Sequence, residues 1–351
     1  MSTYYDQLVE QVVDGGYLPT PLLRVGIRRQ MKERVDIIKA TSLGDSTDTK
    51  MAYVEALRSR PIAINTADAN TQHYEVGTGV LSESLGPRMK YSCCLYPKGG
   101  ETLAQAEIAM LELYVQRAGL KDGMKIFDLG CGWGSLSLYL AEIFPNSSVV
   151  AFSNSRTQKQ HIDAQAAKRG FKNLEVVTGD IAVYDFKGTP LEGTFDRVLS
   201  IELFEHMKNY ELLLAKVASL LKPAGKLFVH IFAHKTTPYD FETGWMTEHF
   251  FTGGTMPSAD LLLYFQKDLN IERQWWVNGK HYGKTCNDWF AKMTAAKKAI
   301  WPHLEETYGK DQTLKWFHRW QVFYLACAEL FDYNDGEEWG VCHYLFSKPG
   351  K

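Results

Sequence analysis

The stretch IFDLGCGWGSLSLYL, which begins at Ile126, constrains the fold more than any other part of the chain. An apolar run that reads as a buried strand leads to Asp128. A Gly130-x-Gly132-x-Gly134 turn follows, and a helix pattern starts at once. Glycines allow the backbone to approach a ligand closely, and the first turn of a helix offers N–H groups that have no partner inside the helix. The stretch therefore predicts a ligand-binding turn between a strand and a helix.

Around this turn, segments that read as strands alternate with segments that read as helices. Strands are expected at 124–130, 147–155, 173–181, 195–201 and 226–234, with helices at 135–144, 156–170 and 209–225. Such alternation is typical of a parallel sheet whose two faces are covered by helices. Further strands are expected at 271–279 and 339–348. Further helices are expected at 4–16, at 24–42, from Thr102 onward, and over about 285–331.

The charge balance and the cysteines narrow the class of protein. The formal net charge is −2 and no Lys/Arg-rich block occurs, which argues against nucleic acid or an anionic membrane as a partner. No apolar run reaches the length of a membrane span, and the first residues lack a secretory pattern. The six cysteines show no metal-ligand spacing, so we expect free thiols, no metal site and a cytoplasmic protein.

A cluster of charged residues follows the fourth expected strand. In FDRVLSIELFEHMKNY, which starts at Phe195, the residues Glu202, Glu205 and His206 come directly after the apolar run. Ligands of open α/β sheets bind outside the carboxyl ends of the strands. If this turn is helical, the three side chains share one face. The alternative is a solvated helix start, whose carboxylates favour the positive end of the helix dipole.

Several motifs together resemble a known superfamily. The D-x-G-x-G-x-G turn is similar to the first motif of class I S-adenosylmethionine-dependent methyltransferases, and not to the G-x-G-x-x-G dinucleotide fingerprint. MKYSCCLY, DLGCGWGSL, FSNSRTQKQ and FEHMKNY resemble the cyclopropane-fatty-acid-synthase-like superfamily. IELFEHMKNY, GGTMPSADLLLYFQ, VNGKHYGKT and FDYNDGEEWGVCHYLF resemble its plant alkaloid N-methyltransferases, of the coclaurine and phenylalkylamine type. The resemblance covers the chain from about Gln72 onward.

This resemblance implies a class I α/β fold. That fold is Rossmann-like, with a mostly parallel seven-stranded sheet, helices on both faces, an N-terminal helical region and a helical insertion near the C-terminus. We expect residues 1–100 to form a helical and substrate-cap region, and residues 101–235 to form the cofactor-binding core. Residues 236–351 should hold the substrate-binding insertion, its helices and the final strands.

The implied cofactor is S-adenosyl-L-methionine, with S-adenosyl-L-homocysteine as product. The residues expected around it are Tyr91, Ser92, Asp128, Gly130, Gly132, Ser153, Asn154, Gln158, Asp180 and Ile181. Many class members carry an acidic residue after the second strand for the ribose hydroxyls. This chain has none there, so Ser153, Asn154 and Gln158 would take that role. Asp180 would meet the adenine amino group.

The implied activity is methylation of the amine nitrogen of a small aromatic alkaloid, a benzylisoquinoline or a phenylalkylamine. Such an amine is mostly an ammonium at pH 7 and must lose a proton before it reacts. His206 is the expected base, Glu205 would orient it or act through water, and Glu202 would attract the cation. The expected substrate contacts are Tyr74, His230, Tyr282, Trp320 and Phe323, although the aromatic residues could equally be core.

Two other functions stay open. Cyclopropane synthases hold a bicarbonate base, and Cys93, Glu205, His230 and Tyr282 match that set, which would suit methyl transfer to an unsaturated lipid. Against this stands Glu202, because a carboxylate is costly beside an alkene. A cofactor-binding protein without catalysis is the other alternative. The sequence settles neither the amine nor the oligomeric state, a homodimer included.

Overall fold

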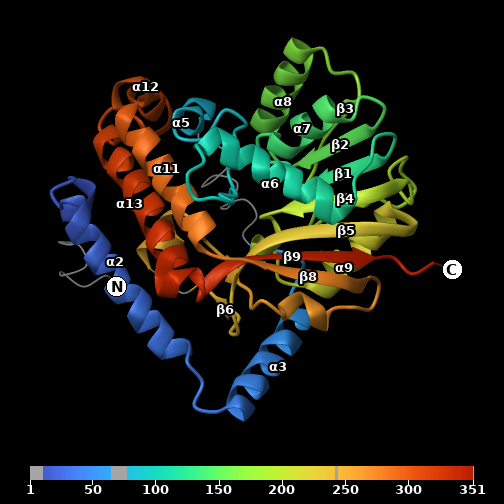
Figure 1. Cartoon of the computed structure of the whole chain (residues 1–351), viewed down its shortest axis with the longest axis horizontal. Coiled ribbons are helices and arrows are strands. Elements are labelled where there is room, and N and C mark those ends of the chain that lie inside the picture. Colours follow the sequence, from blue (N-terminus) through green and yellow to red (C-terminus); the bar gives the residue numbers. More distant parts are fainter. Residues whose placement is uncertain (1–10, 65–76, 242–243, 351) are drawn as a thin grey trace.

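A seven-stranded sheet in the order β3-β2-β1-β4-β5-β9-β8 organises the molecule (Figure 1). The computed structural model describes residues 11–64, 77–241 and 244–350. The strands are β1 (Lys125–Leu129), β2 (Ser148–Ser153), β3 (Leu174–Thr178), β4 (Phe195–Ile201), β5 (Leu221–His234), β8 (Asn270–Val277) and β9 (Trp339–Ser347). The first five pair in parallel, whereas β9 runs antiparallel to both β5 and β8. The predicted mostly parallel seven-stranded sheet is confirmed.

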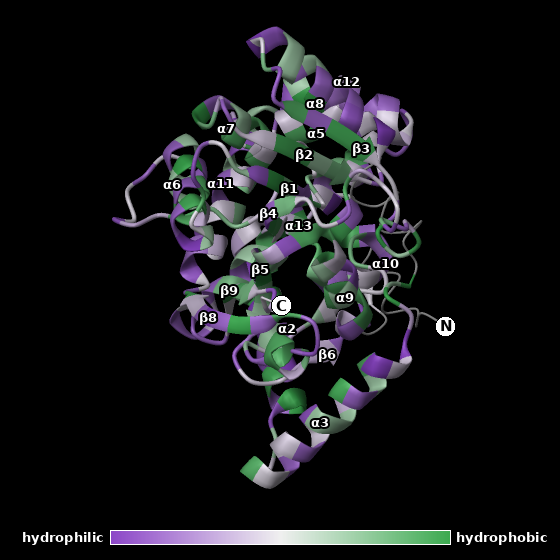
Figure 2. Ribbon diagram, turned by 90° about the vertical axis from the view of Figure 1, so that its right-hand side faces the viewer, coloured by the Kyte–Doolittle hydropathy of each residue, from purple (hydrophilic) through white to green (hydrophobic). Residues whose placement is uncertain are grey.

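Helices cover both faces of the sheet, which is why the central strands are nearly continuous apolar runs. Figure 2 shows this hydrophobic colouring along β1 and β2. The helices α6 (Leu103–Ala118), α7 (Ser135–Ile143) and α8 (Arg156–Arg169) pack on one face, and α9 (Tyr210–Leu220) packs on the other. The helix expected at 209–225 is longer than the observed helix α9. It ends at Leu220, and the Lys-Pro-Ala-Gly segment already belongs to β5.

Local sequence explains where these helices begin and end. Thr102 and Gln105 form a capping box at the start of α6, which satisfies two N–H groups that the helix cannot bond internally. Gly119 closes α6 in the left-handed conformation (φ 62°). Helix α7 begins directly after Gly134, so the glycine turn opens onto a helix N-terminus as predicted.

A second set of helices flanks the sheet in Figure 1. It comprises α2 (Thr20–Ile38), α3 (Leu43–Ser59), α5 (Thr78–Ser82), α10 (Trp245–His249), α11 (Lys280–Ala295), α12 (Lys297–Tyr308) and α13 (Thr313–Asp332). Helix α2 lies along α13, where Glu329 accepts from both Arg24 and Arg28. Two short strands, β6 (Tyr239–Asp240) and β7 (Thr255–Met256), form a separate ribbon.

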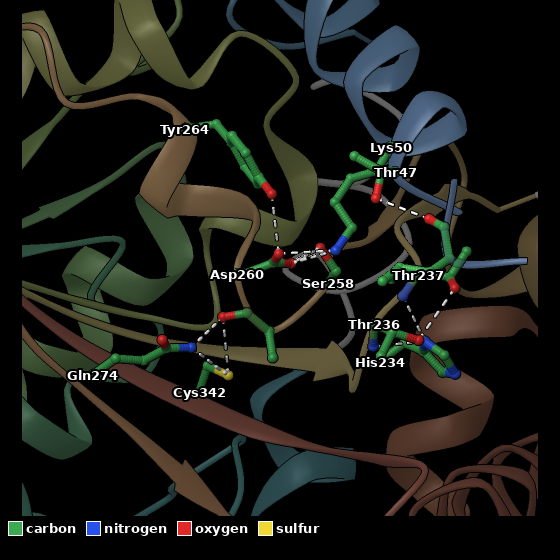
Figure 3. A network of polar contacts seen from close by, with 12 residues as sticks. Thr47, Lys50, His234, Thr236, Thr237, Ser258, Asp260, Tyr264, Gln274 and Cys342 are labelled. Carbon is green, nitrogen blue, oxygen red and sulfur yellow. Dashed lines mark hydrogen bonds and ion pairs between the residues drawn. The ribbon is translucent and has the colours of Figure 1, made fainter. Parts of the chain in front are cut away.

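A polar network fixes the C-terminal end of β5 (Figure 3). Lys50 of α3 pairs with Asp260 at 2.8 Å, and Asp260 also accepts from Ser258 and Tyr264. Nearby, His234 Nδ1 accepts from the backbone N–H groups of the two threonines that follow β5. Among the helices of residues 11–64, 77–241 and 244–350, none has the length and apolarity that a membrane crossing requires.

Candidate active site

The glycine turn forms the floor of the site. The N–H groups of Gly130 and Cys131 both donate to the carbonyl of Phe152 at 3.0 Å, which ties the turn to β2. Gly132 has φ 52°, and nothing lies within 4 Å of the position that a Cβ would take there. A larger residue at 132 would adopt an unfavourable conformation and would project into this open space.

Beside the turn, the amide nitrogen of a buried glutamine has no hydrogen-bond partner among the described residues. Ser153 donates to Gln158 Oε1 at 2.7 Å and accepts from the N–H of Ser155 at 3.0 Å, so one end of the Gln158 amide is fixed. In the described part of the chain, its Nε2 has no hydrogen-bond partner, although the side chain is buried. An unpaired buried donor is costly, and Gln158 lines a pocket beside the glycine turn. The amide therefore fits an acceptor on a ligand, such as a ribose hydroxyl.

All ten residues predicted for the cofactor line the two adjoining hollows of the site. Seven surround the first pocket: Gly130, Gly132, Ser153, Asn154, Gln158, Asp180 and Ile181. Tyr91, Ser92 and Asp128 line the second, which we call the chamber. Asp128 accepts from Ser137, and burial raises its pKa to about 7. Ile64 and Thr252, which no sequence motif marked, also line the first pocket, as does Leu203 beside Glu202.

The chamber has a volume of about 1200 Å³ and an aromatic wall. Helices α2, α10, α11 and α13 surround it, together with the segment around Tyr91 and the glycine turn. Its aromatic lining consists of Tyr91, Tyr114, Trp133, Phe232, Tyr239, Phe241, Trp245, Phe251, Tyr282, Trp289, Phe323 and Phe331. Such a wall suits a flat apolar ligand, and the few polar groups in it then set the orientation.

Glu202 is one of those polar groups, and three donors hold its carboxylate. Oε1 accepts from the N–H of Cys93 at 2.9 Å and lies 3.0 Å from His230 Nε2, and Oε2 accepts from the hydroxyl of Tyr282 at 2.6 Å. The backbone of Glu202 has φ 50°, in the left-handed region that side chains other than glycine seldom adopt. Burial raises the pKa of Glu202, and the positive charge of Lys90 opposes that rise.

Glu205 does not share the position of Glu202 in the chamber wall. Residues Phe204–His206 form a single 3₁₀ turn, so the shared face expected for an α-helix does not form. Among the described residues, Glu202 and His206 line the chamber, and Glu205 does not. Glu205 Oε1 accepts from the N–H of Phe232 at 2.8 Å, and its Oε2 has no partner among the described residues. Burial, and then the charge of Glu202, raise the pKa of Glu205 well above its usual range.

His206 lies where the pocket and the chamber meet. It lines both of them, and its ring stacks on Phe251 with the centroids 6.0 Å apart. Burial lowers the pKa of His206 to about 4, with Glu202 acting in the opposite direction. The imidazole is therefore neutral at pH 7 and has a lone pair with which it can accept a proton.

The predicted substrate contacts have four different placements. Tyr282 and Phe323 line the chamber, whereas His230 lies behind Glu202. Trp320 is fully buried and donates to the hydroxyl of Tyr308 at 3.1 Å, so it is part of the core behind the wall. Tyr74 lies outside the described residues.

Comparisons with known proteins identify the family of the chain. The family model of mycolic acid cyclopropane synthetase matches residues 63–339. An (S)-coclaurine N-methyltransferase of Thalictrum flavum subsp. glaucum is 38% identical over 341 residues, which cover 95% of this chain and 93% of the relative. A cyclopropane-fatty-acyl-phospholipid synthase of Escherichia coli (strain K12) is 31% identical, over 77% of this chain and 66% of its own length.

A solved structure is similar over almost the whole chain. It is a crystal structure of coclaurine N-methyltransferase bound to N-methylheliamine and S-adenosylhomocysteine (SAH), 35% identical, with a TM-score of 0.93. The similarity covers 97% of this chain and 99% of that one. The chain therefore belongs to the mycolic acid cyclopropane synthetase family, in which it is an S-adenosylmethionine-dependent N-methyltransferase.

Proposed function

We propose that this enzyme methylates the amine nitrogen of a small aromatic alkaloid of the benzylisoquinoline or phenylalkylamine type. The relatives named for coclaurine support this substrate class, and so does the aromatic wall of the chamber. Flat rings can pack against that wall, and an ammonium near them gains cation–π attraction of about 0.5–2 kcal/mol per ring.

The fixed carboxylate of Glu202 is the observation that carries the proposal. It lies in the wall of an apolar chamber, where an unpaired charge is costly. The donors of Cys93, His230 and Tyr282 offset part of that cost, and a cationic substrate would offset more. A neutral alkene would add no counter-charge to that of Lys90.

The residues of the site divide the chemistry between them. S-adenosylmethionine, when bound by the ten residues around the glycine turn, supplies the electrophilic methyl group. Glu202 binds the ammonium and orients its nitrogen. Neutral His206 accepts the proton that the ammonium must lose, while Glu202 beside it stabilises the resulting imidazolium. Glu205 bonds the backbone of Phe232 and so holds the turn that carries His206.

A lipid substrate is the competing function, because a cyclopropane synthase is among the relatives. Three of the groups that would hold a bicarbonate, namely those of Cys93, His230 and Tyr282, bond the carboxylate of Glu202 instead. The fourth, Glu205, bonds a backbone N–H of β5. A side-chain carboxylate thus takes the donors that bicarbonate would need, which supports the amine over the lipid.

The test uses the wild-type enzyme and cofactor labelled in its methyl group. Three substrates are compared: a secondary phenylalkylamine, a benzylisoquinoline and vesicles of an unsaturated phosphatidylethanolamine. We expect label in at least one amine and none in the lipid. Cyclopropanation of the lipid without methylation of any amine would replace the proposal by the lipid function, and transfer to none of them would favour a cofactor-binding protein without catalysis.

A further inference from the structure

A chain of buried polar side chains leads from Glu202 away from the chamber. His230 Nε2 lies 3.0 Å from Glu202 Oε1, and His343 Nε2 lies 2.8 Å from His230 Nδ1. Arg117 Nη1 lies 2.6 Å from His343 Nδ1 and ends the chain on α6. The two histidines are fully buried and face each other across the β5–β9 pair, where their Cα atoms are in register. Among the described residues of the chamber wall, neither Arg117 nor His343 occurs.

Arg117 fixes the direction of each hydrogen bond that links it through the two histidines to Glu202. A guanidinium can only donate, so His343 Nδ1 must accept and the proton of the neutral ring must be on Nε2. His343 Nε2–H then donates to His230 Nδ1, which places the proton of His230 on its Nε2. That N–H donates to Glu202. The hydroxyl of Tyr114 also lies 3.0 Å from His230 Nδ1 and can share the lone pair of that nitrogen with His343.

We propose that Arg117 and His343 are positioning residues that fix the tautomer of His230 and so keep the Glu202 carboxylate ready for a cationic amine. Without Arg117, His343 could carry its proton on Nδ1. Its Nε2 would then accept from His230 Nδ1, and His230 Nε2 would present a lone pair to the carboxylate instead of a proton. This role rests on the proposed function, in which Glu202 binds the ammonium.

The charge states of the hydrogen-bonded side chains between Glu202 and Arg117 agree with a role in hydrogen bonding and not in moving charge. Burial lowers the pKa of both histidines well below the usual range, so both rings are neutral at pH 7. The Arg117 guanidinium lies over Trp275, with its central carbon 5.0 Å from the ring centroid, and burial lowers its pKa to about 10, so it stays charged. Lys90 supplies the other cation near the two rings, and it donates to the carbonyl of Cys93 at 2.7 Å.

The groups that face Glu202 come from several elements. They are Lys90, Cys93 and Cys94 from the segment before α6, Tyr114 from α6, Glu205 and His206 from the turn after β4, His230 from β5, and Tyr282 and Cys286 from α11. Among the described groups around Glu202, His230 is the one that hydrogen bonds link to Arg117. A change at Arg117 should therefore act on Glu202 by one route.

The experiment compares Arg117→Met with a matched control, Arg273→Met. Arg273 lies over the same Trp275 ring at 5.2 Å. Of the two arginines, it is Arg117 that bonds His343. We expect Arg117→Met to raise the KM for a cationic amine about 3- to 30-fold, the range of indirect effects carried through a contact chain. The Kd for S-adenosylmethionine should stay unchanged, and the acid limb of the kcat/KM profile should move to higher pH. Arg273→Met should stay within about twofold of wild type.

Two further measurements keep the test decisive if Arg117→Met does not fold. His343→Gln offers an amide N–H to His230 and should keep a KM near that of wild type, whereas His343→Leu should behave as Arg117→Met does. In ¹⁵N-histidine spectra of the wild type, both rings should be Nε2–H tautomers. A His343 with its proton on Nδ1, or equal KM values for Arg117→Met and Arg273→Met, would overturn the role of the chain. If the wild type methylates no amine, the failure lies in the proposed function instead.

Discussion

Replacing Glu202 by glutamine separates its charge from its shape. The amide is nearly isosteric, so Oε1 can still accept from Cys93 and His230. Its NH₂ group then points to Tyr282, whose hydroxyl can rotate and accept in place of donating. Each of these groups keeps one hydrogen bond, although the Tyr282 proton loses its acceptor, and we therefore expect a folded protein that has lost one negative charge.

The expected loss follows from the contact that the charge makes. A hydrogen bond to a charged partner contributes about 1.5–3 kcal/mol. Because 1.36 kcal/mol corresponds to a factor of ten, kcat/KM for a cationic amine should fall by about 10- to 150-fold, mainly through KM. Affinity for the cofactor should hardly change, since the pocket residues around Asp180 are untouched.

The stability of Glu202→Gln provides an independent readout. Burial raises the pKa of Glu202 above its value in the unfolded chain, so the folded protein favours the protonated form. Above the unfolded pKa, near 4.5, the charge therefore destabilises the fold. Removing it should leave the Tm at pH 7 equal or higher. A variant that folds and keeps the wild-type KM for the amine would refute the proposed contact, and a large drop in Tm would show that the carboxylate is mainly structural.

Three other changes test separate parts of the molecule. Gly132→Val should abolish binding of S-adenosylmethionine without unfolding the protein, because the new side chain enters the pocket; unchanged affinity in calorimetry would contradict this. His206→Ala should lower kcat by about 10²–10⁴ at pH 7, with partial recovery at high pH where free amine is present, and wild-type turnover would place proton removal elsewhere. Thr102→Ala, at the capping box of α6, should cost about 0.5–2 kcal/mol in chemical denaturation but leave kcat unchanged, and a matched loss of activity would argue against a purely local role.

The sequence predicts the strands well but not their order. Alternating segments place the five parallel strands, because buried parallel strands are short apolar runs between turns, and two later strand-like runs place β8 and β9. The insertion of β9 between β5 and β8 depends on contacts more than 60 residues apart in the chain, and no local pattern encodes it. The end of α9 was misplaced for a related reason: pairing with β4 draws Leu221 into β5 before the proline and glycine that appear to end the helix.

The site shows the same division between local and tertiary signals. The residues around the glycine turn and after β2 follow from strand-end positions, and all of them reach the pocket or the chamber. The spacing of Glu202, Glu205 and His206 suggested one helical face, but the positive φ of Glu202 and a single 3₁₀ turn direct Glu205 to the backbone of β5. His343 was missed altogether, because its partnership with His230 exists only through the pairing of β5 with β9.

The ionisation of Glu202 also affects whether a cationic or a neutral ligand binds more tightly. A buried carboxylate with a raised pKa pays a cost to stay charged, and an approaching ammonium lowers that cost. By linkage, the ionised form of Glu202 must bind the ammonium more tightly than the neutral form does, by the same free energy. An uncharged ligand of equal shape gains nothing from this coupling. Discrimination between cationic and neutral ligands in the proposed reaction would therefore come from one carboxylate and the donors that hold it, while the aromatic wall would select for ring shape.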